Sequence, residues 1–528
     1  MIDATTTTDL ETTASNSNGS PSEKSPVEVY AVFGAEPEVL AYAMAKYSRS
    51  ALSMKESLKE ISQQKAEKFL NTFYFQYGHR SIADLAHVAM AIERLSILAA
   101  IAVADEQRWD GQERSTRYQD FKKSGYFSPN FGGGGESQRL YRTTIEDLFT
   151  QYESLSERMF QHLAGTTPRP GDMKQEAYER TLRARAFDFS RYLLPLAANT
   201  SLGEIVNART LETQIARLLA HTHAEVRSLG ELLKEAATTS AYNVGDESLQ
   251  KLVEEIKAIS PELGERAAQE LLREVRVAPT LVKYATPSAY EIETRRELRG
   301  VAAELMGNVA VAAAPTVDLL DVEPLEIELA ATLIYEHSHY PYRQIRGSIE
   351  AAGEVIRREI IDMGLRHRSR HDEMQRAFCA GQQFRFDILM DIGGFRDMHR
   401  HRRCIQIGQE FTTRHGYESP DELQAAGVQR DYDEAMQRAA SAVEELARRG
   451  SPEDSQYAIP LGFRKRTLFK MDFAEVVYIS ELRTGPAGHF SYRKAAYDMY
   501  EAVAQKYPAL GKYLRVHDIK EPVDLLKR

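Results

Sequence analysis

Apolar residues recur about every 3.6 positions along most of the chain, which is the pattern of amphipathic helices that pack on a core. The more charged stretch between residues 241 and 314 also reads as mostly helical. The helices predicted in this way cover Val39–Tyr47, Met54–Tyr77, Ser81–Val103, Arg139–Leu163, Lys174–Tyr192, Leu249–Ile259, Glu262–Val277 and Ala289–Leu305. The pattern therefore predicts a helix-rich protein.

Two short apolar runs interrupt the helical pattern, and each is brief enough for a strand. They are Val27–Phe33 and Val317–Asp321. Glu36-Pro37 follows the first run and Glu323-Pro324 follows the second, and a proline suits the first turn of a helix. The same strand-to-helix signal thus occurs twice, far apart in the chain.

Further short matches follow both runs in the same order, which indicates an internal duplication. The first series is Tyr47, Gly78-His79, Leu95–Ala104, Glu113–Tyr118, Leu194-Pro195 and Asn207-Ala208-Arg209. The second series is Tyr335, Arg370-His371, Phe384–Phe395, Arg400-His401-Arg402, Ile459-Pro460 and Asp472-Phe473-Ala474. The period is too long for a solenoid, whose repeats span about 20–50 residues. We therefore expect two copies of one domain, at residues 27–240 and 315–528, joined by a helical connector at 241–314.

Composition favours a cytoplasmic globular protein with a disordered tail. Of the 528 residues, 43% are apolar and 27% are charged, which suits two to four domains. Residues 1–26 are rich in Thr, Ser and Asn and lack the apolar core of a signal peptide, so we expect them to be disordered. The two cysteines, Cys379 and Cys404, exclude a disulfide framework and fit a reducing compartment.

Charge and hydropathy argue against two classes of partner. A net charge of −10 gives no overall attraction for nucleic acid or an anionic membrane, so any anion site must be a local basic cluster. No apolar run reaches the roughly 18–20 residues that cross a bilayer. The best candidate, Leu95–Ala104, is expected to be a buried helix. We therefore expect neither a nucleic-acid nor a membrane partner.

The stretch Phe395–Arg403 is such a basic cluster, with four arginines and two histidines in nine positions directly after an apolar segment. A buried helix that ends in Arg-His-Arg suits a phosphate or an electron-rich ring, because guanidinium offers a planar donor fork. A solvated basic helix end is the alternative. Arg366-His367-Arg368 has the same letters without the apolar helix, and we interpret it as a decoy.

The first copy resembles flavin-dependent thymidylate synthases, the thymidylate synthase complementing family. The segments that match in order are Gly78-His79-Arg80-Ser81, Glu113-Arg114-Ser115-Thr116-Arg117-Tyr118, Arg191 to Pro195, Asn207-Ala208-Arg209 and Glu225-Val226-Arg227. The counterpart of the family's Arg-His-Arg is Asp105-Glu106-Gln107, in which the charge is inverted. The first copy therefore lacks this element of the family site.

The second copy shows the opposite losses. It keeps Arg400-His401-Arg402 and an arginine, Arg483, where the family places the one that contacts uracil. The family's Ser-x-Arg-Tyr has become Thr412 to His415, and its Asn-Ala-Arg has become Asp472-Phe473-Ala474. Asp397 stands where the family has glutamine beside Arg-His-Arg.

Because the resemblance implies active sites assembled between subunits, these complementary losses predict one composite site made by both copies. Random decay of a dead copy is the alternative. The resemblance also implies the fold class: α+β, with two tandem helix-rich domains, each around a small, mostly antiparallel sheet. It implies a tetramer of single domains, so two fused chains are expected to form a homodimer.

The activity implied by the resemblance is reductive methylation of dUMP, or a related pyrimidine nucleotide, to dTMP. FAD is the cofactor, and methylenetetrahydrofolate and NADPH are the cosubstrates. The expected catalytic residue is Arg483, which would act on the pyrimidine. The expected substrate-binding residues are Glu113, Ser115, Arg117, Arg191, Arg400 and Arg483, and the expected FAD-binding residues are Arg400, His401, Arg402, Glu113, Asn207 and Arg209.

Each of these residues has a structural alternative, such as a helix cap for Ser115 or Asn207 and a surface position for Arg191. His367 and His371 are four positions apart, but no cysteine or carboxylate completes a zinc spacing, so we expect no metal. A pseudoenzyme that binds nucleotide or flavin, or acts only as a scaffold, is the alternative function. Nucleic-acid binding through residues 396–403 ranks last, because the chain is acidic and has no known binding motif.

Overall fold

The structure is a computed structural model that describes residues 30, 32, 34–46, 53–60, 80–131, 135–321, 324–367, 375–378, 384–512 and 514–526. Contacts divide the chain into two units, Met1–Ala35 and Glu36–Arg528. The elements below belong to the second unit. The expected disordered tail, the strand Val27–Phe33 and the motif Gly78-His79 fall wholly or almost wholly outside the described residues.

Two small antiparallel sheets form the framework of this unit. The first has the order β1-β3-β2 and the second the order β4-β5-β7-β6. The strands are β1 (His87–Ser96), β2 (Asp110–Glu113), β3 (Asn199–Asn207), β4 (Val317–Leu319), β5 (Phe384–Asp391), β6 (Ile405–Gly408) and β7 (Arg464–Met471). Helices surround both sheets, so the predicted α+β class with two tandem domains is confirmed.

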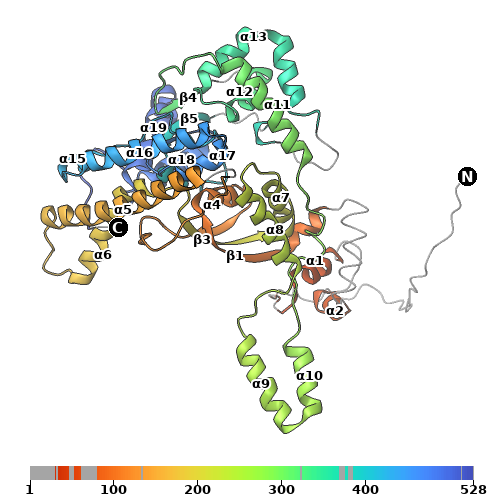
Figure 1. Cartoon of the computed structure of the whole chain (residues 1–528). Helices are drawn as coiled ribbons and strands as arrows, with labels where there is room; N and C mark the ends of the chain where they lie inside the picture. Colours follow the sequence, from red (N-terminus) through yellow and green to blue (C-terminus); the bar gives the residue numbers. More distant parts are fainter. Residues whose placement is uncertain are drawn as a thin grey trace, which may run out of the picture. The chain divides into compact units, whose positions relative to one another are not determined.

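The helices fall into three groups along the chain. The first group is α1 (Pro37–Lys46), α2 (Met54–Glu60), η2 (Arg80–Leu85), α4 (Ile97–Ala104), α5 (Gly135–Thr166), α6 (Gln175–Ser190), η3 (Arg191–Leu193), α7 (Ala208–Leu219) and α8 (Ala224–Thr238). The second group follows in sequence, before strand β4: α9 (Asp246–Ile259), α10 (Pro261–Leu271) and α11 (Ala289–Met306), of which α9 and α10 pack as a hairpin that projects at the bottom of Figure 1. The last group is α12 (Leu325–Glu336), α13 (Tyr342–Met363), η4 (Arg376–Phe378), α14 (Ile392–Met398), α15 (Asp421–Ala425), α16 (Gln429–Arg448), α17 (Pro452–Ser455), η5 (Gln456–Ala458), α18 (Phe473–Arg483), α19 (Phe490–Lys506) and α20 (Pro508–Gly511).

The duplication is visible in how strands pass into helices. In each half one strand leads into a short buried helix and a later strand leads into a longer one. The residue before each of these helices is an N-cap, because its side chain accepts a hydrogen bond from the backbone N–H three residues further on. The four caps are Ser96 before α4, Asp391 before α14, Asn207 before α7 and Asp472 before α18.

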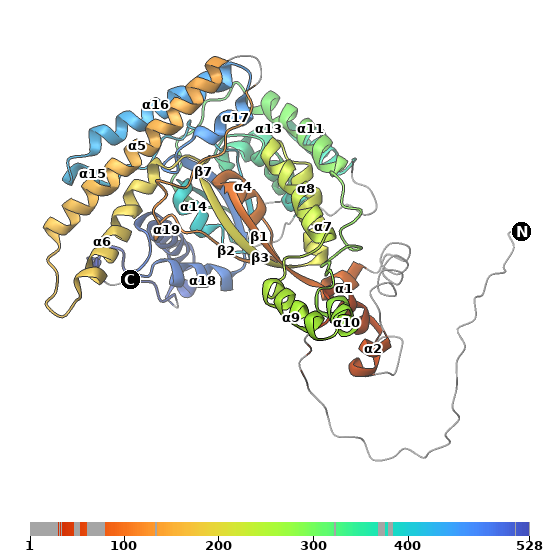
Figure 2. The same cartoon turned by 60° about the horizontal axis from the view of Figure 1, so that its bottom comes forward.

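The two halves share an interface and a core. Equivalent segments pair across it: Leu196 N donates to Ile459 O, and Leu461 N donates to Leu194 O, each over 2.9 Å. Both views show α5 and α16 side by side (Figures 1 and 2). One hydrophobic cluster includes Tyr192 and Ile215 of the first half with Ile459 and Phe463 of the second. The copies therefore pack on one another within one chain.

Two helix predictions were wrong over part of their length. Residues 87–96 form strand β1, in which Val88, Met90 and Ile92 are buried on one face. Alanines lie between these residues, so the run looks apolar on every side and hides its period of two. The apolar segment before the Arg-His-Arg motif is likewise strand β5 over Phe384–Asp391, and only α14 is helical.

Other predictions agree with the structure within a few residues. The helices expected over 139–163, 174–192, 249–259 and 289–305 correspond to α5, α6, α9 and α11. The helix expected over 262–277 ends at Leu271, and the one expected over 54–77 is described only to Glu60. The boundaries of the tail, domains and connector stay predictions.

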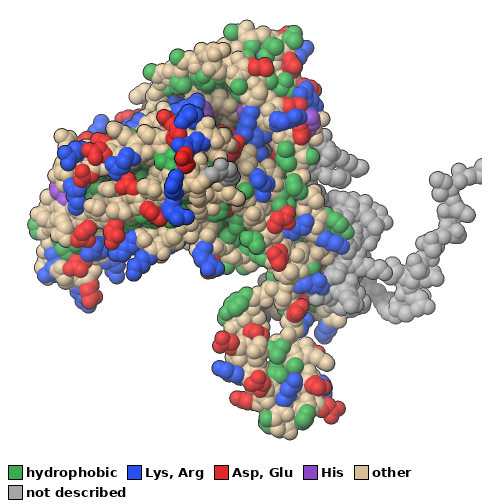
Figure 3. Space-filling view, viewed as in Figure 1, with side chains coloured by type: hydrophobic (Ala, Val, Ile, Leu, Met, Phe, Trp, Pro, Cys, Tyr) green, Lys and Arg blue, Asp and Glu red, His purple; other side chains and the backbone are tan. Residues whose placement is uncertain are grey.

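No helix in the described part of the chain is long and apolar enough to cross a membrane. On the face shown in Figure 3, basic and acidic side chains are interspersed. This face therefore presents no extended field of one sign of the kind that favours nucleic acid.

Candidate active site

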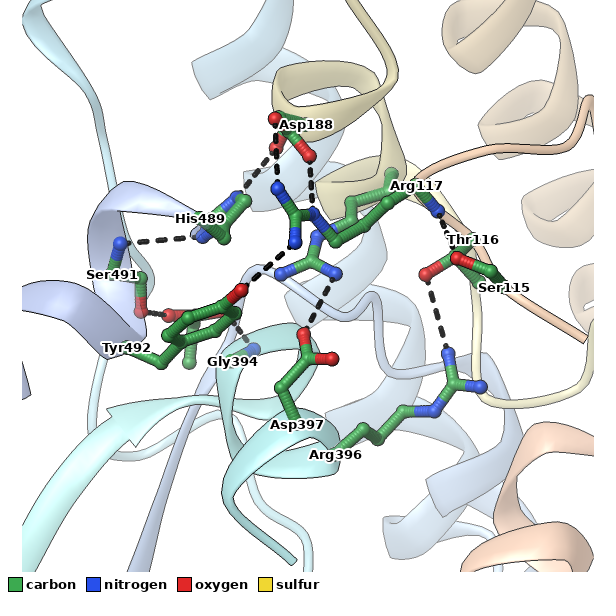
Figure 4. A network of polar contacts seen from close by, with 12 residues as sticks. Ser115, Thr116, Arg117, Asp188, Gly394, Arg396, Asp397, His489, Ser491 and Tyr492 are labelled. Carbon is green, nitrogen blue, oxygen red and sulfur yellow. Dashed lines mark hydrogen bonds and ion pairs between the residues drawn. The ribbon is translucent and has the colours of Figure 1, made fainter. Parts of the chain in front are cut away.

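Helix α14 carries two charged side chains of the second half against the first half. Arg396 Nη1 donates to Thr116 Oγ1 over 3.4 Å (Figure 4). Its Nη2 donates to the Glu113 carboxylate. Arg191 Nη1 donates to Asp397 Oδ2, also over 3.4 Å. The Asp391 cap starts α14 directly after β5, and this places the Arg396-Asp397 dipeptide at the boundary between the copies.

Arg117 lies at the same boundary and is 6% exposed. Its Nε donates to Asp188 over 2.7 Å and its Nη1 to the Tyr492 hydroxyl over 2.9 Å (Figure 4). Its Nη2 donates to Ala487 O over 3.2 Å. The guanidinium groups of Arg117 and Arg483 lie 5.6 Å and 5.4 Å from the centre of the Tyr492 ring. One aromatic ring of the second half therefore contacts a predicted site arginine from each copy.

Asp397 is the point at which predicted residues of both copies converge. Burial alone would raise the pKa of its carboxyl group, but the positive charges of Arg191, Arg117, Arg400 and Arg483 lower the pKa below its usual value. Two of these arginines belong to the first half and two to the second. A single carboxylate thus lies in the field of four arginines that the sequence had assigned to one composite site.

Arg483 is held by a chain of two further residues. Its Nε donates to His401 Nε2 over 2.7 Å, and His401 Nδ1 lies 3.4 Å from the Glu475 carboxylate. Burial lowers the pKa of His401, although the Glu475 hydrogen bond opposes this shift. A neutral imidazole with its proton on Nδ1 satisfies both contacts. Glu475 therefore orients His401, and His401 orients Arg483.

Two hollows open beside this chain of residues and share Arg402. The guanidinium of Arg402 lies 4.0 Å from the centre of the Trp109 ring, so the two halves touch here as well. The larger hollow, of about 660 Å³, is lined by Arg400, His401, Arg402, Arg403, Ala474, Glu475, Tyr478, Leu482 and Arg483. The smaller, of about 370 Å³, is lined by His87, Gln107, Arg108, Trp109, Asp110, Ile205, Val206, Asn207 and Arg402.

The shared wall of these hollows carries uncompensated positive charge. Burial and the neighbouring Arg400 lower the pKa of Arg402 to about 10, and Asp110 opposes the shift only in part. The buried Nε of Arg402 has no hydrogen-bond partner among the residues that the structure describes. In the described part of the chain neither Arg400 nor Arg402 forms an ion pair with a carboxylate. An anion with several oxygens would complete this arrangement.

The family model described as thymidylate synthase complementing protein matches the chain twice, over residues 31–241 and 319–509. The chain belongs to this family. A UPF0159 protein of Chlamydia pneumoniae is 28% identical over 522 residues, covering 93% of this chain and 91% of that protein. A flavin-dependent thymidylate synthase of Clostridium tetani is 24% identical over 202 residues, covering 38% of this chain and 77% of that protein.

Solved structures give a more distant likeness. The flavin-dependent thymidylate synthase of Helicobacter pylori, complexed with FAD and dUMP, is 15% identical with a TM-score of 0.26 and covers 38% of this chain and 89% of that one. A UMP/dUMP methylase of Streptomyces cacaoi, bound with 5-Br dUMP, is 13% identical with a TM-score of 0.26 and covers 38% of this chain and 84% of that one.

The residues predicted from the family motifs fall into two neighbouring groups in this family member. Arg191 pairs with Asp397, whose carboxylate also lies in the field of Arg117, Arg400 and Arg483, and Ser115 accepts a hydrogen bond from Arg117 N over 3.2 Å. The second group lies at the smaller hollow, where Asn207 caps α7 and shares the wall with Arg402. Glu113 joins the first group through Arg396.

Arg209 lies outside both groups. Its Nη1 donates to Asp84 over 3.3 Å, and it does not line either hollow. The interpretation of Arg366-His367-Arg368 as a decoy stays a prediction; Arg366 and His367 contact Glu297, and Arg368 and His371 lie outside the described residues. Within the described ranges no three His, Cys, Asp or Glu side chains gather as metal ligands would.

Sequence reasoning missed the residues that hold the site residues in place. Asp188, Glu475 and Tyr492 belong to none of the quoted motifs, and only tertiary packing brings them to their arginines. Trp109 is the only tryptophan of the chain and follows the charge-inverted triplet by two positions. Its place beside a family motif is the sequence signal that could have identified it.

Charged residues of both lost motifs act on one buried lysine, Lys465, and we call these motifs the degenerate region: residues 105–107 and 410–415. Burial lowers the pKa of Lys465 to about 8, although the carboxylates of Asp105, Glu410 and Glu336 oppose that shift. Three arginines pair with the acidic residues of this region. The pairs are Arg376 with Asp105, Arg217 with Glu106, and Arg299 with Glu410.

Proposed function

We propose that this chain catalyses FAD-dependent reductive methylation of dUMP, or a related pyrimidine nucleotide, at one composite site between its two copies. Methylenetetrahydrofolate is the carbon donor and NADPH the reductant in this proposal. The observation that carries it is that Arg117 of the first copy and Arg483 of the second lie 5.6 Å and 5.4 Å from one ring, Tyr492, while Arg191 of the first copy pairs with Asp397 of the second. Family membership supports the reaction class.

The residues present fit a flavin dinucleotide at the two hollows. The unpartnered Nε of Arg402 and the uncompensated charge of Arg400 and Arg402 suit a pyrophosphate, and Trp109 and Tyr478 offer aromatic faces beside them. In the proposal Arg400, His401, Arg402 and Asn207 hold FAD. The FAD contacts of Arg209 and Glu113 rest on the family resemblance alone, since neither residue lines a hollow. FAD supplies the hydride when it is bound.

The chain's own residues bind and polarise the nucleotide. Ser115, Arg117 and Arg191 receive the phosphate, and their guanidinium groups neutralise its charge. Arg483 donates to the pyrimidine carbonyl and so favours negative charge on the ring, which activates its C5 position. Because Arg483 is held through His401 and Glu475, this donor is oriented before the nucleotide arrives.

Assembly and location complete the proposal. The family resemblance supports a homodimer of this duplicated chain, which would hold four copies of the domain, and a cytoplasmic location fits its low cysteine content. Light scattering at micromolar concentration checks the first point. A dimer mass is expected, and a strict monomer contradicts it.

The experiment that tests the function is a titration of purified protein with FAD and then with dUMP, followed by flavin absorbance. We expect saturable FAD uptake, a spectral change on adding dUMP, and dTMP once methylenetetrahydrofolate and NADPH are present. Arg402→Ala should weaken FAD uptake. Arg296→Ala, which removes a surface arginine of α11 that pairs with Glu293, is the matched control and should not. Colourless protein that takes up no FAD overturns the proposal.

A pseudoenzyme is the second candidate, and one observation favours it. Arg117 and Arg191 are 6% and 1% exposed and already contact the carboxylates Asp188 and Asp397. Such a paired cluster also suits a scaffold that links the two copies. Binding of FAD and dUMP without dTMP formation would select this reading over the enzyme.

A further inference from the structure

Asp397 forms an ion pair with Arg191 at the boundary between the copies. Its side chain is 16% exposed, and its nearest cation is the Nη1 atom of Arg191 at 3.4 Å. Arg117, Arg400 and Arg483 add their charges to the same carboxylate. Asp397 therefore offsets part of the charge of Arg117, Arg191 and Arg483, the arginines that the proposed function, on which this inference rests, gives to the nucleotide.

Arg191 keeps unused donors beside this ion pair. Its side chain is 2% exposed, yet neither Nε nor Nη2 has a hydrogen-bond partner in the described structure. A buried guanidinium with two unpaired donor atoms is costly unless something accepts from them. A single carboxylate at 3.4 Å thus leaves Arg191 short of acceptors.

The backbone of α14 permits the guanidinium to lie this close. A Cβ atom at Gly393 would stand 3.3 Å from Arg191 Nε and 3.4 Å from its Cζ. A side chain at this position would therefore crowd the guanidinium. Glycine keeps the space beside Arg191 open next to Asp397, on the side where the unpaired donors are.

We propose that the Asp397 carboxylate holds the place of a ligand anion, so that the site accepts a phosphomonoester nucleotide only by displacing Asp397 from Arg191. A phosphate has three terminal oxygens and can satisfy donors of Arg191 that the carboxylate leaves unpaired. The exchange trades one anion for another, and no residue changes its covalent state. Asp397 thereby selects against weakly held anions and sets the affinity for the phosphate group.

Two consequences separate this role from a structural ion pair. Removing the charge of Asp397 should tighten binding of a nucleotide that carries a phosphate, because a like charge next to a bound anion opposes it strongly. The same change should leave binding of the unphosphorylated nucleoside almost unaltered. A residue that only links the copies would affect both ligands alike.

The test is titration calorimetry of dUMP and of deoxyuridine with the full-length wild type, Asp397→Asn and Asp397→Gln. Asp431→Asn is the matched control, because Asp431 also pairs with an arginine of the other half, Arg158, but at the exposed surface. We expect each Asp397 variant to bind dUMP at least about ten-fold more tightly than the wild type, with less than about a two-fold change for deoxyuridine. Asp431→Asn should match the wild type for both ligands.

Thermal unfolding guards against a variant that folds poorly. Loss of Asp397 removes the ion pair of Arg191 and leaves only the charge of Asp391 nearby, so the ligand-free variants should melt earlier, and dUMP should raise their melting temperature more than that of the wild type. Unchanged or weaker dUMP binding by folded Asp397→Asn and Asp397→Gln overturns the inference. If those proteins still take up FAD, the proposed function stands without it; if none takes up FAD or dUMP, both fail.

Discussion

In the regions around Asp397 and Lys465, one buried charge is subject to several charges of the opposite sign, and the signs are exchanged between the two regions. At Asp397 one carboxylate lies among four arginines of both copies. At Lys465 one buried ammonium lies among Asp105 of the first copy and Glu410 and Glu336 of the second. The first region contains the motif residues that the copies kept, and the second is the degenerate region.

The difference lies in how the remaining charges are balanced. In the degenerate region Arg376, Arg217 and Arg299 each pair with an acidic residue of the lost motifs. Near Asp397 the cations Arg400 and Arg402 have no such partner among the described residues. The acidic residues of the degenerate region are thus matched by internal ion pairs, whereas the region near Asp397 keeps charge that the proposed function assigns to a ligand.

The largest expected contrast is between Arg117→Ala and Arg414→Ala, the same change at matching motif positions of the two copies. Arg117→Ala removes the closer of the two ion pairs of the buried Asp188, at 2.7 Å, and leaves only the one with Arg185 at 4.0 Å, so it should cost about 3–5 kcal/mol of unfolding free energy. Arg414 is exposed, so its replacement should stay within about 0.5 kcal/mol. Urea unfolding measures both. Equal losses would remove the distinction between the two regions.

A smaller effect is expected when the chain that holds Arg483 is broken at Glu475. Glu475→Gln removes the charge that favours protonated His401, so the pKa of His401, already lowered by burial, should fall further. The loss in kcat should be about ten-fold, with little change in KM for dUMP, because Glu475 positions Arg483 rather than binding the nucleotide. An NMR titration of His401 measures this pKa and does not require that the enzyme turn over. A pKa that rises in the variant contradicts this role.

The histidines near the degenerate region should make its folded structure lose more stability at low pH than the region around Asp397. Burial lowers the pKa of His223 to about 4, of His337 to about 3 and of His415 to about 4. The unfolded chain, with histidine pKa values near about 6.5, binds these protons first, so stability is full above that pH and falls as the pH drops towards 4.

Asp391, at the start of α14, should give stability the opposite dependence on pH. Burial raises the pKa of its carboxyl group to about 6, and the stability that this gives is lost as the pH rises through 6. Hydrogen exchange at pH 7 and pH 5 should therefore show α7 and α12 losing protection on acidification before α14 does. Earlier loss of protection in α14 would contradict the assignment.

The smallest effect is predicted for Lys465→Met. Methionine keeps much of the volume, and Asp105 and Glu410 retain their arginines. Replacing a buried cation by an apolar side chain of similar size is often nearly neutral for stability. Binding of dUMP should change by less than about two-fold, measured by calorimetry. A loss of dUMP affinity comparable to that of Arg191→Gln would place the working site at the degenerate region.

Much of this architecture could be predicted from the sequence because it depends on local patterns. Matching caps such as Asn207 and Asp472 follow from short motifs, and so does the complementary loss of Arg-His-Arg. Strand β1 was missed because alanines fill the positions between Val88, Met90 and Ile92. The partners of the arginines, such as Asp188 and Glu475, depend on packing between distant segments, which no local pattern encodes.

The most direct test of a single composite site is a double-mutant cycle between Arg191 of the first copy and Arg483 of the second. Calorimetry would give the dUMP affinity of the wild type, Arg191→Gln, Arg483→Gln and the double variant. If both arginines serve one nucleotide, their effects should be coupled by at least about 1 kcal/mol. Effects that add within about 0.3 kcal/mol would mean that the two copies act independently, and would contradict the composite site.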